Sequence, residues 1–108
     1  MSNWDPSHQT DHEEKVVTKT KKKVKKPPLY KVLLHNDDFT TMEFVVQILM
    51  TVFHKKEEDA TMIMLAVHMQ GMGVAGVYTH EIAQEKVNRV MTEARNHDFP
   101  LLCTMEPE

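Results

Sequence analysis

The hydrophobic positions of this chain change their spacing several times, and each change marks a predicted element. Apolar residues are nearly continuous from Leu29 to His35, which predicts a buried strand. They follow helical spacing from Thr40 to about Phe53, and a second helical segment spans Glu57 to Gln70. We expect Thr40 to cap the first helix, because Glu43 three residues later completes a capping box.

The pattern after the second helix predicts two more strands and one more helix. Gly71 suits the residue that follows the second helix, because glycine adopts a positive φ at little cost. Residues 73–78 predict a strand, Thr79 can cap a helix that extends to about Arg95, and residues 101–105 predict a final strand. The order is therefore β-α-α-β-α-β. Its short connections favour a small α+β sandwich, in which three helices pack on a three-stranded antiparallel sheet.

The first 27 residues differ in composition from the rest of the chain. They are polar, contain few aliphatic residues and end at the pair Pro27-Pro28. Such a segment buries too little apolar area to offset the entropy that ordering would cost. We therefore expect a flexible N-terminal extension over residues 1–27 and one domain over residues 28–108.

Charge is distributed unevenly between these two parts. The net charge is −3, but residues 1–28 hold seven lysines against four acids, whereas residues 29–108 hold six basic groups against twelve acidic ones. An acidic domain argues against nucleic acid as the partner, because binding phosphates needs clustered lysine and arginine. The lysine run over residues 19–26 fits a contact with nucleic acid or a soluble tether equally well.

Several other function classes lack their sequence signals. The longest apolar stretch is far too short to span a bilayer, and no signal-peptide segment follows Met1, so we expect no membrane partner. The lone cysteine, Cys103, fits a reducing compartment such as the cytoplasm, and its strand-like surroundings suit a core residue better than a nucleophile. Zinc-ligand spacings and a phosphate-binding glycine loop are absent, so we expect no metal, no cofactor and no enzyme activity.

A cluster of hydrogen-bond acceptors directly follows the first strand. Asn36, Asp37 and Asp38 stand where the apolar run ends. One interpretation is an ordinary turn, because Asn and Asp side chains bond to their own backbone. The other is a site for a positively charged group at the edge of an apolar core; calcium is disfavoured because the EF-hand pattern is absent. The residues alone leave both interpretations open.

The second predicted helix is apolar at nearly every position, so we expect it to be covered on more than one side. His68 interrupts this run, and one interpretation is a partly buried side chain whose hydrogen bonds are satisfied. In the other, a neutral imidazole faces the loop carboxylates across a small pocket with walls of Met42, Met64 and Val67. Methionine suits such walls, because it is flexible and polarizable.

Three separated motifs resemble the ClpS family, the bacterial adaptors of the ClpAP protease. The motifs lie in Pro27–Val45, Ala60–His68 and Pro100–Thr104, and the similarity covers nearly all of residues 27–106. The resemblance implies a cytoplasmic adaptor that binds N-degrons, proteins whose first residue is Leu, Phe, Tyr or Trp. It also implies delivery of these substrates to the N-terminal domain of the ClpA unfoldase.

The same resemblance assigns roles to individual residues by motif match. The α-amino group of the substrate would be bound by Asn36, Asp37 and His68. The hydrophobic pocket would be formed by Asp38, Thr40, Met42, Val45, Met64, Val67 and Leu101. Met42 would exclude β-branched first residues, and Glu81 and Lys86 would dock on ClpA. Lys56 departs from the expected pattern, because Asp would be a better N-cap for the second helix.

Two other classes of function stay open beside the adaptor. A small metal-dependent or acid–base enzyme would use Asp37, Asp38 and His68. A structural module associated with the ribosome is the third possibility, because the expected fold resembles the C-terminal domain of the ribosomal stalk protein. A shared fold does not settle function, and the pairing of Asn-Asp-Asp with a histidine favours the adaptor.

Overall fold

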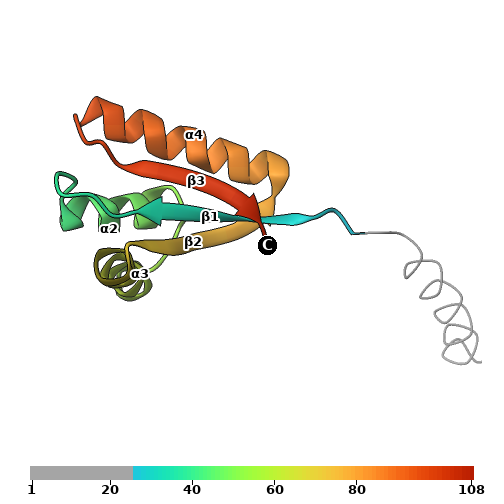
Figure 1. Ribbon diagram of the computed structural model, residues 1–108, viewed down its shortest axis with the longest axis horizontal. Helices are drawn as coiled ribbons and strands as arrows, with labels where there is room; N and C mark the ends of the chain where they lie inside the picture. Colours follow the sequence, from blue (N-terminus) through green and yellow to red (C-terminus); the bar gives the residue numbers. More distant parts are fainter. Residues whose placement is uncertain (1–25) are drawn as a thin grey trace, which may run out of the picture.

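The three strands form one antiparallel sheet with β1 at its centre (Figure 1). The structure is a computed structural model that describes residues 26–108. The strands are β1 (Leu29–His35), β2 (Met72–Thr79) and β3 (Leu102–Pro107), in the order β2-β1-β3. The predicted flexible extension falls almost wholly outside the described residues, so it stays a prediction together with the boundary at residue 28.

Three helices complete the predicted order β-α-α-β-α-β, which is confirmed. They are α2 (Met42–Thr51), α3 (Glu57–Gln70) and α4 (His80–Asn96), and all element ends lie within about two residues of those predicted. Lys56 precedes α3 without a capping bond from its side chain, as expected. Thr79 occupies the N-cap position of α4, but its side chain makes no capping hydrogen bond either.

The core lies between one face of the sheet and the helices. Val32 and Leu34 of β1 are fully buried there, because alternate residues of a strand point to the same face. They pack in one cluster with Leu49 of α2, Val67 of α3 and Val90 of α4. All three helices therefore cover the same side of the sheet, which makes the fold the predicted α+β sandwich.

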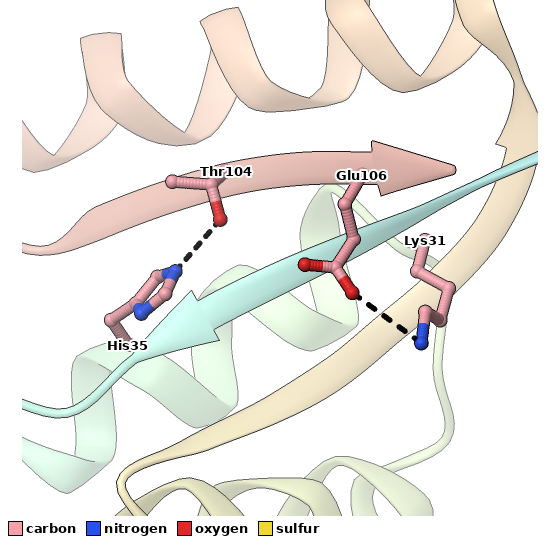
Figure 2. Close-up of polar contacts among 4 residues, drawn as sticks. All are labelled: Lys31, His35, Thr104 and Glu106. Carbon is pink, nitrogen blue, oxygen red and sulfur yellow. Dashed lines mark hydrogen bonds and ion pairs between the residues drawn. The ribbon is translucent and has the colours of Figure 1, made fainter. Parts of the chain in front are cut away.

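The opposite face of the sheet carries polar pairs between β1 and β3 (Figure 2). Lys31 Nζ lies 3.5 Å from Glu106 Oε2, and these two residues are direct cross-strand partners. His35 Nε2 lies 2.7 Å from the hydroxyl oxygen of Thr104, which pairs with Leu33. This face does not form the pocket described below, which lies between the helices and the loop after β1.

The start of α2 differs from the prediction. The N-cap is Thr41, whose hydroxyl oxygen accepts a hydrogen bond from the backbone N–H of Phe44 at 3.1 Å. Thr40 lies in the preceding loop, where its hydroxyl donates to Asp37 Oδ2 at 2.7 Å. The predicted capping box at Thr40 is therefore wrong, because a carboxylate in the loop takes the hydroxyl that would have capped the helix.

The prediction that α3 is covered on more than one side is also wrong. Its buried residues form a single stripe of Ala60, Met64 and Val67. Met62 and Met69 are 69% and 79% exposed although both are strongly apolar. The reason is the position of α3, which packs on α2 and β2 with one side and leaves the other side uncovered. His68 belongs to the exposed part of this helix, so the partly buried alternative does not hold.

Candidate functional site

A pocket of about 250 Å³ lies between the β1–α2 loop, the start of α2 and one side of α3. Nine residues line it: Asn36, Asp37, Asp38, Thr40, Met42, Val45, Met64, Val67 and His68. All nine are among the site residues predicted from the sequence. Leu101, the remaining predicted pocket residue, does not belong to this lining; it is 2% exposed and packs in the core.

Asp37 organises the loop that forms one side of the pocket. Its Oδ1 accepts hydrogen bonds from the backbone N–H groups of Phe39 at 2.8 Å and Thr40 at 2.7 Å. Its Oδ2 accepts from the Thr40 hydroxyl. The turn interpretation of the sequence therefore holds for Asp37, while the same carboxylate lines the pocket. An ionised carboxylate offers about four acceptor positions, so three loop bonds leave room for a further donor.

These hydrogen bonds also affect the ionisation of Asp37. Partial burial is the largest single influence and opposes the charged form. The bonds from the Thr40 hydroxyl and from the N–H groups of Thr40 and Phe39 together outweigh it, and they hold the pKa of Asp37 below its ordinary value of 3.8. Asp37 is therefore ionised at neutral pH and gives this side of the pocket a negative charge.

A hydrogen bond between backbone groups joins the loop to the end of α3. The N–H of Asn36 donates to the carbonyl oxygen of Gly71 at 2.9 Å. Gly71 ends α3 in the left-handed conformation, with φ of 92°, and its own N–H donates to Val67 O at 3.0 Å. This connection places Asn36 beside the last turn of α3, which carries His68. The polar groups of the loop and of the helix thus border one pocket.

The remaining walls are apolar and continuous with the core. Val45, Met64 and Val67 are 7%, 9% and 2% exposed and belong to the core cluster. Met42, the first residue of α2, is 45% exposed, so it lies at the mouth of the pocket. Hydrogen-bond acceptors and a negative charge therefore lie directly beside the apolar walls of the same cavity. This arrangement suits a ligand that carries a cation next to an apolar group.

The two predicted docking residues of α4 have different surroundings. Glu81 is exposed in the first turn of the helix. Lys86 is half-buried; its Nζ donates to the carbonyl oxygen of Val52 at 2.7 Å and lies 5.7 Å from the centre of the Tyr78 ring. Lys86 thus connects α4 to the end of α2, a contact that no spacing pattern in the chain predicts. The docking roles of both residues stay predictions.

Two features of the described residues bear on possible enzyme chemistry. Burial raises the pKa of Cys103 to about 12, so this thiol is a poor nucleophile at neutral pH. No group of three or more His, Cys, Asp or Glu side chains within residues 26–108 could hold a metal ion, although Asp37, Asp38 and His68 line one pocket. In the same residues, no helix is both long enough and apolar enough to cross a membrane.

The fold and the pocket together define a small α+β binding domain. Comparison with known families identifies it further. The family model of the ATP-dependent Clp protease adaptor protein ClpS matches residues 25–104, and the chain belongs to this family. The family assignment and the adaptor function predicted from the sequence motifs are confirmed, and the enzyme alternative finds no support.

Individual relatives agree with this assignment over most of their length. The ClpS adapter of Myxococcus xanthus is 56% identical over 100 residues, which cover 91% of this chain and 94% of the relative. That of Parvibaculum lavamentivorans is 58% identical over 93 residues, 86% of this chain and 84% of the relative. The solved structure of Agrobacterium tumefaciens ClpS2 bound to L-phenylalaninamide superposes with a TM-score of 0.75 at 38% identity. The superposed region covers 77% of this chain and 100% of the Agrobacterium chain.

Proposed function

We propose that this adaptor selects substrates for the Clp protease by binding the free N-terminal residue of N-degrons in the pocket described above. The observation that carries the proposal is the meeting of acceptor groups and apolar walls in one cavity of about 250 Å³. The ligand of the Agrobacterium relative supports it. L-phenylalaninamide has a free α-amino group, an aromatic side chain and an amide in place of its carboxylate, so it mimics the first residue of a polypeptide.

Recognition of the chain terminus rests on the polar side of the pocket. A terminal ammonium carries a charge and three donors, and the side chains of Asn36, Asp37 and His68 supply three acceptors on this side. Each charge-assisted hydrogen bond contributes about 1.5–3 kcal/mol. An internal residue presents an uncharged amide with one donor. Free N-termini are therefore bound and internal residues are rejected.

Selection of the first side chain rests on the apolar walls. Burying a Leu or Phe side chain contributes roughly 1.5–3 kcal/mol, whereas Ala gains much less. Met42 stands at the mouth of the pocket, where it hinders first residues that branch at Cβ. Reduced by the entropy of association, these contributions give affinities on the order of micromolar.

The partner that receives the substrate is the N-terminal domain of the ClpA unfoldase, docked on α4 through Glu81 and Lys86. The pocket is lined by the β1–α2 loop, α2 and α3, and α4 contributes no residue to it. A substrate in the pocket therefore leaves the exposed side of α4 free for the unfoldase. The adaptor acts in the bacterial cytoplasm without catalysing a reaction, because it only changes which protein reaches the protease.

A titration with fluorescent peptides that differ only in their first residue tests the proposal. Peptides with a free N-terminal Leu, Phe, Tyr or Trp should bind, and N-acetylation should weaken binding by about 100-fold or more, because it removes the charge and two donors. A peptide with the same Leu at an internal position is the control. Equal affinity for free and acetylated Leu peptides would refute the role of the ammonium group.

A further inference from the structure

Gly73 lies where β2 passes closest to α3. It pairs with Leu34 of β1 and faces the helices. A Cβ atom at this position would stand 2.9 Å from Val67 Cγ2, and 3.5 Å from both the carbonyl oxygen of Ile63 and the backbone nitrogen of Val67. Carbon atoms in contact are ordinarily about 3.5–4.0 Å apart. Only glycine therefore fits this crossing without moving Val67 or the helix.

Val67 connects this crossing to the pocket. Its side chain is 2% exposed and lines the pocket on the α3 side. Valine branches at Cβ and has essentially one preferred rotamer in a helix, so it cannot swing aside freely. An added methyl group at residue 73 must therefore displace a residue of the pocket wall.

We propose that Gly73 is a specificity-determining residue of the binding site, although it does not touch the ligand. The missing side chain lets α3 lie close to β2, and this approach sets the position of Val67 and hence the room for the first side chain of a substrate. The effect of Gly73 on substrate choice rests on the proposed function. Large aromatic first residues need the full width of the cavity, so they depend on Gly73 more than Leu does.

The variant Gly73→Ala tests this with peptides that begin with Leu, Phe or Trp and have a free N-terminus. We expect the affinity for Trp to fall about tenfold more than the affinity for Leu, because the displaced wall narrows the cavity. Gly76→Ala is the matched control. It adds the same methyl group to the same strand, but that Cβ would meet Tyr78 Cε2 at 2.7 Å, and Tyr78 does not line the pocket. The ratio of Trp to Leu affinities should change less than about twofold in this control.

A double variant separates the effect on the wall from a general loss of stability. In a Val67→Ala background the crowding methyl groups are gone, so Gly73→Ala should change the Trp to Leu ratio by less than about twofold. This measurement also decides the matter if Gly73→Ala alone does not fold. A full tenfold change in the absence of the Val67 side chain would overturn the inference.

Crystal structures of the wild type and Gly73→Ala test, without any ligand, whether residue 73 sets the position of Val67. We expect Val67 or the adjacent turn of α3 to move and the cavity to shrink; an unmoved Val67 and an unchanged cavity would overturn the inference. If the wild type bound none of the free-amine peptides, the proposed function would fail. The displacement of Val67 would still confirm or refute that Gly73 sets the shape of the pocket.

Discussion

Replacing Asp37 by Asn removes a negative charge from the pocket while changing the shape of the side chain very little. The Asn carbonyl oxygen can still accept from the N–H groups of Phe39 and Thr40, the two partners of Asp37 Oδ1. The amide nitrogen that replaces Oδ2 cannot accept from the Thr40 hydroxyl, which donates to Asp37 at 2.7 Å. The variant therefore loses the charge-assisted bond from this hydroxyl inside the loop and one charged acceptor for the ligand.

These two losses have separate magnitudes. The loop bond involves a charged but partly exposed group, so its loss should lower the free energy of unfolding by about 1 kcal/mol. A terminal ammonium should lose one charge-assisted bond worth about 1.5–3 kcal/mol, which weakens binding of a free-amine Leu peptide roughly 10- to 100-fold. Binding is thus more sensitive than stability to Asp37→Asn.

Fluorescence anisotropy measures the peptide affinity, and urea unfolding measures the stability of the same preparations. Asp98→Asn is the matched control: it removes the same charge from the turn after α4, does not line the pocket, and has a φ of 60° that Asn tolerates as well as Asp. It should leave the peptide affinity within about twofold of the wild type. An Asp37→Asn protein that binds the Leu peptide as tightly as the wild type would contradict the assignment of Asp37 to the ammonium group.

Three further perturbations test other parts of the structure. Hydrogen bonds hold the pKa of Asp37 in the folded protein below its ordinary value of 3.8, so its ionised form stabilises the fold. This contribution is complete when the pH is above the pKa of Asp37 in the unfolded chain. It is lost as the pH falls through the pKa of Asp37 in the folded protein. The stability difference between wild type and Asp37→Asn in urea should therefore shrink between about pH 6 and about pH 3, and a constant difference would be inconsistent with this origin. Met42→Ala should admit peptides with Ile or Val as first residue in the anisotropy assay; if they stay excluded, another residue guards the pocket. Lys86→Met loses the bond to Val52 O and should lower the free energy of unfolding by about 1 kcal/mol, whereas Glu81→Gln should change it by less than about 0.5 kcal/mol. Equal stability of these two variants in urea would show that the lysine contact contributes nothing.

Local patterns in the sequence determine most of the fold but not which of two adjacent threonines begins a helix. Thr40 and Thr41 both precede the apolar stripe of α2, and Glu43 made Thr40 the better candidate. Thr41 is the cap because Asp37 occupies the hydroxyl of Thr40. Competition between a loop and a helix for one hydroxyl group depends on the folded geometry of the loop, which no spacing rule contains.

The apolar character of α3 shows a second limit. Residue types indicate that the helix has apolar side chains in most directions, but its coverage depends on where it lies in the fold. Met62 and Met69 stay exposed because α3 packs on its neighbours with only one side.

The pocket itself joins a loop and a helix some thirty residues apart. Spacing within one element does not bring Asp37 and His68 together. The complementary chemistry of the loop carboxylates and the histidine suggested a shared pocket as one of two interpretations, and the resemblance to known adaptors then assigned both residues to it. The same resemblance assigned Leu101 to the pocket; this residue is not among the lining residues, and its role stays a prediction.

The burial of Cys103 has a practical consequence for solution studies. With a pKa of about 12, its reactive thiolate amounts to roughly one part in 10⁵ at pH 7, and the side chain is only 3% exposed. Maleimide reagents should therefore not react with the one native cysteine of this chain. A cysteine introduced on the surface would carry a dye or spin label at a single defined position, with no need for a cysteine-free background.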